Sequence, residues 1–162
     1  MQQTNSAIKI AVIANTYSAL YFHIIFSTKN RKLWLKPDIE KRVWEILGGI
    51  AREHRMTPIQ IGGFDDHIHA LVSLPPTLSV SKAVQYLKAL SSKWTHETLP
   101  GFKRFAWQDG YAAFTVSKSQ LSAVTAYIRR QRTHHAQIGF QEEFRAALRK
   151  HEVEFEERYV WG

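Results

Sequence analysis

The chain has 162 residues, no cysteine and a formal net charge of +8 at pH 7. This length fits one domain with a real hydrophobic core, and the lack of cysteine excludes disulfides, thiolate metal sites and a thiol nucleophile. Residues 1–140 hold 18 of the 22 Lys and Arg residues but only eight of the 14 Asp and Glu residues, so the positive charge belongs to the body of the domain. A basic body suits a polyanionic partner, although it is also compatible with a merely soluble basic surface.

The N-terminal segment contains the apolar run IKIAVIA at residues 8–14. This run is far shorter than the roughly 20 residues of a membrane span, and no basic region precedes it as in a signal peptide. We therefore expect a cytoplasmic protein with no membrane partner. Residues 1–14 are interpreted as an extension of unknown role, and residues 15–162 as a single domain.

The first half of the chain predicts a strand, a helix and a hairpin. Residues 20–28 alternate in the manner of a strand, and apolar residues recur at helical spacing from Pro37 to about Arg55, although Gly48-Gly49 interrupts that pattern. Two strands, at 57–64 and 67–74, are joined by a turn at Asp65-Asp66.

The second half predicts a helix at 79–97, a strand at 105–115 interrupted near 109–110, and a helix from 121 to about 135. Ser117 and Gln120 have the spacing of a capping box for that helix, and a last helix is expected at 141–150. The order β-α-β-β-α-β followed by helices predicts an α+β fold, a ferredoxin-like antiparallel sheet with helices on its faces.

Two histidines stand one residue apart in the expected strand 67–74. Alternate residues of a strand face the same side, so His67 and His69 share one face, whereas Ile68 and Ala70 belong to an apolar row on the other. Two neutral imidazoles at this spacing can share a divalent cation, although on spacing alone we favour a buried, hydrogen-bonded pair. Asp66 is either an ordinary turn residue or a hydrogen-bond acceptor for His67.

The expected helix 121–135 carries a polar stripe formed by Tyr127, Arg130, Gln131 and His134. A phenol ordinarily ionises near pH 10, but a phenol aimed at a metal-polarised phosphodiester is a competent nucleophile that leaves a phosphotyrosine. A tyrosine at the edge of the core beside a solvated glutamine is the alternative interpretation.

Five stretches together resemble the single-tyrosine HUH transposases of bacterial insertion sequences. They are LYFHIIFSTKNRK at 20–32, DDHIHALVSLPP at 65–76, SVSKAVQYLK at 79–88, FAWQDGYAAFTVS at 105–117 and YIRRQ at 127–131. The resemblance extends over nearly the whole chain from about residue 15.

The resemblance implies a divalent metal, Mg²⁺ or Mn²⁺, bound by His67, His69 and Gln131. It implies that Tyr127 attacks a DNA phosphate, leaving a 5′-phosphotyrosine and a free 3′-OH that later attacks a second such linkage. Members of the family are homodimers in which the tyrosine helix of one subunit can complete the partner's site, and no small-molecule substrate is implied.

The implied substrate is single-stranded hairpin DNA at the ends of a mobile element. Nine basic residues are candidates for phosphate contacts: Lys29, Arg31, Lys32, Lys82, Lys88, Lys93, Arg129, Arg130 and Arg132. Tyr111 is a candidate for stacking on unpaired bases, whereas Trp34 and Trp107 suit the core or a dimer interface better. His134 and His135 could contact DNA or the metal, but we favour a solvated helix end for both.

Two alternatives to a transposase stay open. One is an HUH nickase of the replication or relaxase type, which shares the metal site and the tyrosine. The other is a domesticated hairpin-DNA-binding protein without transposition. A binder has no chemical need of Tyr127, Gln131 and both histidines together, so we prefer the metal-dependent strand transferase.

Overall fold

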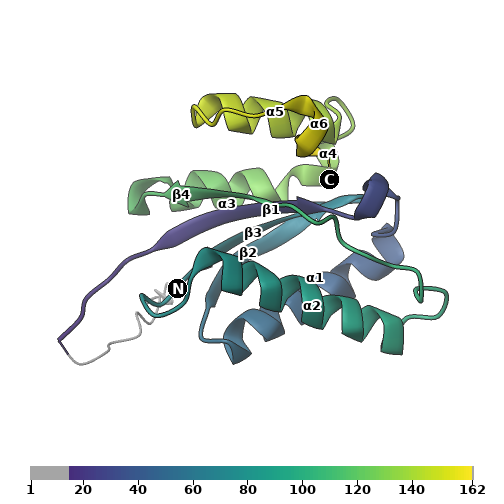
Figure 1. The fold of residues 1–162 in the computed structure, drawn as a ribbon, viewed down its shortest axis with the longest axis horizontal. Helices are drawn as coiled ribbons and strands as arrows, with labels where there is room; N and C mark the ends of the chain where they lie inside the picture. Colours follow the sequence, from purple (N-terminus) through teal and green to yellow (C-terminus); the bar gives the residue numbers. More distant parts are fainter. Residues whose placement is uncertain (1–14, 162) are drawn as a thin grey trace, which may run out of the picture.

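The computed structural model describes residues 15–161, so the expected N-terminal extension lies outside the described residues. Its centre is an antiparallel sheet of four strands in the order β2-β3-β1-β4 (Figure 1). The strands are β1 (Tyr21–Ser27), β2 (Thr57–Phe64), β3 (His67–Ser73) and β4 (Ala112–Val116). This topology confirms the expected ferredoxin-like α+β fold.

Helices lie on both faces of the sheet. The helical elements are η1 (Lys29–Arg31), α1 (Pro37–Glu53), α2 (Val80–Thr98), η2 (Lys118–Gln120), α3 (Leu121–Arg129), α4 (Gln131–His134), α5 (Phe140–Lys150) and α6 (Glu157–Val160). Within residues 15–161, no helix has the length and the apolar character that crossing a bilayer requires.

The helices α1 and α2 cover one face of the sheet and form the main core with it (Figure 1). The strands contribute their expected apolar rows, because Ile24 of β1 pairs with Ala70 of β3 and both side chains are buried. Ser79 caps α2, since its hydroxyl accepts a hydrogen bond from the Lys82 backbone N–H at 3.1 Å. The alternation of β1 and β3 therefore leaves the histidine row on the other face.

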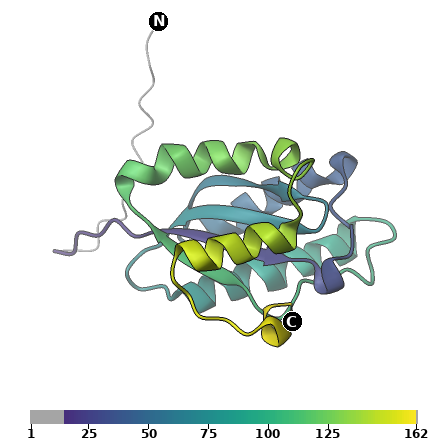
Figure 2. The same ribbon diagram turned by 90° about the horizontal axis from the view of Figure 1, so that it is seen from above.

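The opposite face carries α3, α4 and α5 (Figures 1 and 2). Helix α3 packs Leu121 and Ile128 against Leu71 of β3, and α5 lies over β1 and β4 through a separate apolar cluster. That cluster consists of Ile25, Ala112, Phe114, Phe140, Phe144 and Leu148. Two independent apolar contacts thus hold a second helical layer above the histidines.

The expected strand 105–115 is only partly formed, which corrects its predicted length. Residues 112–116 form β4, and Trp107 makes a single isolated bridge to Thr28. The backbone carbonyls of residues 108–110 turn instead toward Lys88, whose Nζ donates to them at 2.8, 3.3 and 2.6 Å. A loop that gathers three consecutive carbonyls around one ammonium departs from the alternating carbonyl directions of a strand.

The predicted helix 121–135 is divided at Arg130, where φ is −94° and ψ is 12°. The predicted capping box is also absent, because the Ser117 hydroxyl lies 3.1 Å from that of Ser119 and a short 3-10 turn, η2, precedes α3. Tyr127 and Gln131 therefore belong to two helical segments, α3 and α4. By contrast, α1 runs without a break through Gly48-Gly49.

Candidate active site

The two histidines of β3 lie under the second helical layer and are fully buried. Each imidazole has one nitrogen engaged within the sheet. His67 Nδ1 lies 2.7 Å from Asp66 Oδ1, and His69 Nδ1 lies 2.8 Å from His23 Nε2. In the tautomers that donate through Nδ1, both Nε2 atoms keep their lone pairs and face the same space between sheet and helices.

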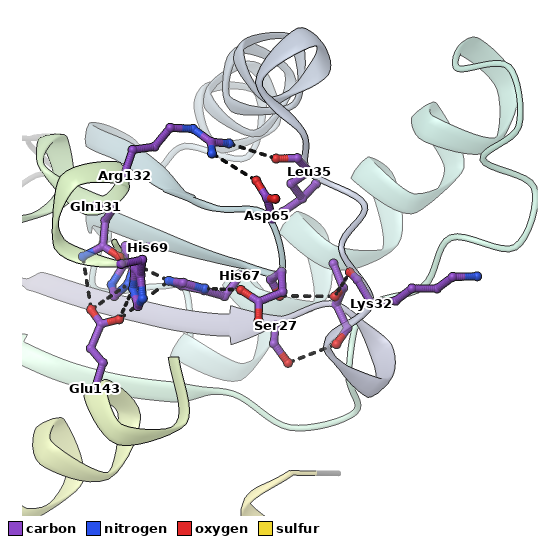
Figure 3. Close-up of polar contacts among 12 residues, drawn as sticks. Ser27, Lys32, Leu35, Asp65, His67, His69, Gln131, Arg132 and Glu143 are labelled. Atoms are coloured by element: carbon purple, nitrogen blue, oxygen red, sulfur yellow. Dashed lines mark hydrogen bonds and ion pairs between the residues drawn. The ribbon is translucent and has the colours of Figure 1, made fainter. Parts of the chain in front are cut away.

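Gln131 reaches the same space from α4 and is also buried. Its Oε1 lies 3.2 Å from His67 Nε2, while its Nε2 donates a hydrogen bond to Glu143 Oε1 at 3.1 Å. The three residues expected to hold a metal are therefore side by side, although the sequence separates His67 from Gln131 by 64 positions (Figure 3).

Two further residues complete the cluster: Glu143, which was not expected at the site, and His135, for which a solvated position was preferred. Glu143 of α5 places Oε1 3.3 Å from His69 Nε2 and Oε2 3.7 Å from His67 Nε2, and Oε2 also contacts His135 Nε2. One ligand atom from each of His67, His69, His135 and Glu143 lies within 4.8 Å of the others. The expected solvated position of His135 is wrong, since its side chain is only 2% exposed.

The signal for Glu143 was visible but ambiguous. Glu143 stands on the apolar stripe of α5, between Phe140 and Phe144, where an acidic side chain is unusual. The signal for His135 was weaker, because the residue follows a helix that the sequence alone places at the surface. Glu143 acquires its position from the docking of α5, and His135 acquires its position at the end of α4, where its ring contacts those of Phe64 and His67; both are tertiary contacts.

The electrostatics of the cluster suit a cation. Burial, and then the neighbouring His67, lower the pKa of His69 well below its usual value, and the same two causes lower the pKa of His135 to about 4. Burial raises the pKa of Glu143 to about 7, an effect that His67 partly offsets. His69 and His135 are therefore neutral at pH 7, the form in which an imidazole binds a metal.

Three polar atoms of the cluster are buried and have no hydrogen-bond partner among residues 15–161: His69 Nε2, His135 Nε2 and Glu143 Oε2. Buried polar atoms without partners are rare because each has lost its bonds to water without replacement. Imidazole nitrogens and a carboxylate oxygen that converge on one point are ligands of a divalent cation. The residues present therefore fit a metal.

Tyr127 projects from α3 beside this cluster and is half-buried. Its ring meets that of His69 edge-on with 5.6 Å between centroids, and that of His134 at the same centroid separation. Tyr127 also borders a cavity of about 860 Å³ between β4, α3 and α5, which His23 and Glu143 line as well. The phenol is thus accessible from a space large enough for part of a polymeric substrate.

The nine basic residues expected to contact DNA are not gathered on one surface. Lys29, Arg31 and Lys32 lie at η1, and Lys82, Lys88 and Lys93 lie on α2, on the sheet face opposite Tyr127 (Figure 1). Arg129, Arg130 and Arg132 follow the tyrosine directly.

Among these nine side chains, Lys88 and Arg132 have several internal partners each, whereas Lys82 and Arg129 each donate one hydrogen bond to a glutamine. Lys88 is held by the three carbonyls of residues 108–110, and burial lowers its pKa to about 8. Arg132 forms ion pairs with Glu40 and Asp65 and donates to the Leu35 carbonyl (Figure 3). The expected aromatic positions also divide: Trp107 is buried in the core, whereas Tyr111 is 39% exposed.

Comparison with known proteins agrees with this arrangement. The family model described as "Transposase IS200 like" matches residues 16–131. The transposase for insertion sequence element IS200 of Salmonella typhimurium is 30% identical over 124 residues, which are 74% of this chain and 81% of that protein.

Solved structures with low sequence identity share the fold. A transposase candidate from Deinococcus radiodurans has a TM-score of 0.60 at 22% identity, covering 74% of this chain and 96% of that one. A REP-associated tyrosine transposase, solved bound to a REP hairpin, has a TM-score of 0.56 at 14% identity, covering 79% of this chain and 76% of that one. Glu143 and His135 both lie beyond the segment that the family model matches.

Proposed function

Because this chain belongs to the IS200-like transposase family, we propose that it cleaves and rejoins single-stranded DNA through a phosphotyrosine at Tyr127, with a divalent metal held by His67, His69 and Gln131. The observation that carries the proposal is the convergence of two buried imidazoles and a carboxamide beside the tyrosine ring. A phenol next to a set of metal ligands is the minimum equipment for metal-assisted phosphoryl transfer.

The chemical step transfers a DNA phosphoryl group from a 3′ oxygen to the Tyr127 oxygen, and it needs no nucleotide hydrolysis. The Tyr127 oxygen attacks the phosphorus, the bond from phosphorus to the 3′ oxygen breaks, and the phenol proton is lost while the leaving oxygen gains one. The products are a 5′-phosphotyrosine and a free 3′-OH. When that hydroxyl attacks a second phosphotyrosine, the bond count is restored and two DNA strands have been exchanged.

The residues around Tyr127 have separate duties in this step. A divalent cation, when bound, supplies Lewis acidity and a fixed point for the scissile phosphate. His67 and His69 offer Nε2 lone pairs because their Nδ1 atoms are engaged by Asp66 and His23. Gln131 offers a neutral carbonyl oxygen from α4, directly after the segment that carries the nucleophile.

The proposed substrate is single-stranded hairpin DNA. The solved relative bound to a REP hairpin supports this class of partner, and the net charge of +8 suits a polyanion. The exposed members of the basic set are the best candidates for phosphate contacts: Lys29, Lys32, Lys82, Lys93, Arg129 and Arg130. Lys88 and Arg132 have a structural role, because each forms hydrogen bonds or ion pairs within the fold.

We further propose a homodimer whose active sites are each assembled within one subunit. The support for assembly in cis is that Tyr127 lies next to His69 of the same chain. The resemblance to transposases that exchange their tyrosine helices makes assembly in trans the competing arrangement.

The deciding experiment uses single-stranded hairpin oligonucleotides taken from the flanks of the gene and labelled at the 3′ end, because the 3′ fragment is the one that becomes attached to the protein. With Mg²⁺ or Mn²⁺, we expect a covalent protein–DNA adduct that EDTA prevents and Tyr127→Phe abolishes. Tyr159→Phe is the matched control, since Tyr159 is 70% exposed and lies on α6.

Two other outcomes would favour the alternatives. Hairpin binding without an adduct under any metal would replace the transferase with a DNA-binding protein. An adduct that is never resolved onto a second labelled strand would favour a nickase, because a transposase must rejoin as well as cleave.

A further inference from the structure

The metal cluster extends beyond the part of the chain that defines the family. We propose that Glu143 and His135 are ligands of the divalent cation in addition to His67, His69 and Gln131, giving a site with three imidazoles, one carboxylate and one carboxamide. This inference rests on the proposed function, in which a cation occupies the site of His67 and His69. It adds residues that follow position 131, where the match to the family ends.

The geometry of the Glu143 carboxylate is that of a ligand rather than of an ion-pair partner. Its two oxygens are turned toward three different imidazoles: Oε1 lies 3.3 Å from His69 Nε2, Oε2 lies 3.7 Å from His67 Nε2, and Oε2 also contacts His135 Nε2. One ligand atom from each of the four residues lies within 4.8 Å of the others, a spacing at which they could share one cation.

Three polar atoms without hydrogen-bond partners support the same conclusion. Within the described part of the chain, His69 Nε2, His135 Nε2 and Glu143 Oε2 are buried without a hydrogen-bond partner, even though they approach one another. Burying a polar atom without a partner costs free energy, and a cation bound to all three atoms would offset that cost. Three such atoms in one place therefore indicate a common ligand.

The helix that carries Glu143 is held on the sheet by apolar contacts, and its Phe140 also stacks on the ring of His67. Phe140, Phe144 and Leu148 of α5 pack against Ile25 and Phe114 of the sheet. Gln131 then orients the carboxylate, because its amide donates to Glu143 Oε1 at 3.1 Å. A ligand held by packing on one side and by a hydrogen bond on the other is positioned before any metal arrives.

The ligand set also selects among metals. Mg²⁺ prefers six oxygen ligands in near-octahedral geometry and keeps several waters, whereas imidazole nitrogens suit transition metals. Three imidazoles and one carboxylate therefore favour Mn²⁺ over Mg²⁺. With Gln131 as a sole third ligand, the site would hold two nitrogens and would discriminate less between the two ions.

The test is a titration of the chelator-treated full-length chain with Mn²⁺, in which electron paramagnetic resonance measures the free ion. We expect one Mn²⁺ per chain, and we expect Glu143→Gln to weaken binding on the order of 10- to 100-fold, the range typical for loss of a group that supports a metal site. Glu142→Gln removes the same charge from the adjacent, exposed position of α5 and should change affinity by less than about threefold, since a screened surface charge interacts weakly.

Competition with Mg²⁺ is the second measurement. We expect Mg²⁺ to displace Mn²⁺ from the wild-type chain only at a large excess. Displacement at comparable concentrations would contradict the nitrogen-rich ligand set.

The variant His67→Ala separates this inference from the proposed function. If His67→Ala abolishes Mn²⁺ binding and Glu143→Gln leaves it unchanged, the metal site of the proposed function stands and the participation of Glu143 is wrong. If His67→Ala leaves binding unchanged, the proposed metal site itself is wrong. Should Glu143→Gln fail to fold by circular dichroism, His135→Gln replaces it, with the same expected loss of affinity and the same contradicting result.

Discussion

Gly62 of β2 lies directly against Ile128 of α3, the residue that follows Tyr127. A Cβ atom at position 62 would stand 2.9 Å from Ile128 Cγ2 and 3.0 Å from the Ile128 carbonyl oxygen. The sheet and the tyrosine helix are therefore in close contact at position 62, where only a glycine fits without displacing Ile128. The distance of Tyr127 from the sheet depends on this contact.

The first prediction follows from this contact. Gly62→Ala should lower the free energy of unfolding by about 1–3 kcal/mol, as overpacking typically does, and should slow adduct formation because α3 is lifted from the sheet. Gly49→Ala is the matched control: a Cβ atom at position 49 would meet nothing within 4 Å, and alanine should stabilise α1 by about 0.5–1 kcal/mol. Chemical denaturation measures both. Equal stability of the two variants would contradict the close approach.

The second prediction concerns the acceptor behind His67. Asp66→Asn should weaken Mn²⁺ binding by about 10-fold, because the carboxylate that holds His67 Nδ1–H at 2.7 Å fixes the tautomer presented to the metal. Asp109→Asn, at an exposed loop position, is the control and should leave affinity unchanged. The measurement is the same Mn²⁺ titration, and an unaltered affinity in Asp66→Asn would mean that Asp66 is only a turn residue.

The third prediction separates two arginines that the sequence places together. Arg132→Ala should lower the free energy of unfolding by about 1–2 kcal/mol, a value reduced because the side chain is 34% exposed. Arg130→Ala should change stability by less than about 0.5 kcal/mol, as expected at an exposed position, yet weaken hairpin binding and reduce its salt dependence. Thermal unfolding and binding at two salt concentrations distinguish the two. Identical behaviour would show that both arginines contact DNA.

The fourth prediction is a pH dependence of the metal-free chain. Burial lowers the pKa values of His23, His69 and His135 in the folded chain. Below about pH 6.5 these three histidines are therefore protonated in the unfolded chain while they are still neutral in the folded chain. Their contribution to stability is present above that pH and is lost as the pH falls. Glu143 acts in the opposite direction, since its raised pKa of about 7 gives a contribution that is present at low pH and lost as the pH rises toward 7.

Three histidines outweigh one glutamate, so the melting temperature in EDTA should rise from pH 4.5 to 6.5. Glu143→Gln removes the opposing contribution. The free energy of unfolding should then rise more steeply with pH, by about 1.4 kcal/mol per pH unit, the value for one proton. Melting curves across this range test the sign. A melting temperature that falls as the pH rises would mean that the histidines are not buried as neutral groups.

The fifth prediction addresses how the site is assembled. When Tyr127→Phe and His67→Ala proteins are mixed, each chain lacks one half of the machinery. Assembly in cis predicts no adduct from the mixture, because Tyr127 lies next to His69 of its own chain. Recovery of adduct would show that subunits exchange their tyrosine helices.

The sequence predicted the parts of the site that depend on local periodicity. Alternation in residues 67–74 placed both histidines on one face, and the four-residue spacing of Tyr127 and Gln131 brought both to the same cluster, even though the helix breaks at Arg130 between them. The family resemblance assigned roles to these residues, and the match over residues 16–131 confirmed the family.

The remaining features of the fold and of the site depend on tertiary contacts, which leave no periodic pattern in the local sequence. Glu143 enters the site only because α5 docks on Ile25 and Phe114, and no periodicity states which sheet a helix will cover. The sequence suggested that Lys88 was an exposed cation on a helix. In the structure its ammonium binds the carbonyls of the loop 108–110, and the sequence does not show where this loop runs. The shortened β4 has the same origin.

The register of β3 between its two neighbours has a consequence for misfolding. Ile68 pairs with Phe26 on one side and with Gly63 on the other, so a slip of one residue would turn the whole strand over. His67 and His69 would then enter the apolar core beneath α1 and α2, and Ile68 and Ala70 would take their place at the site. Such a chain would bury two imidazoles without partners and would also have no metal ligands. The two proposed metal ligands thereby also disfavour misregistered pairing of the sheet.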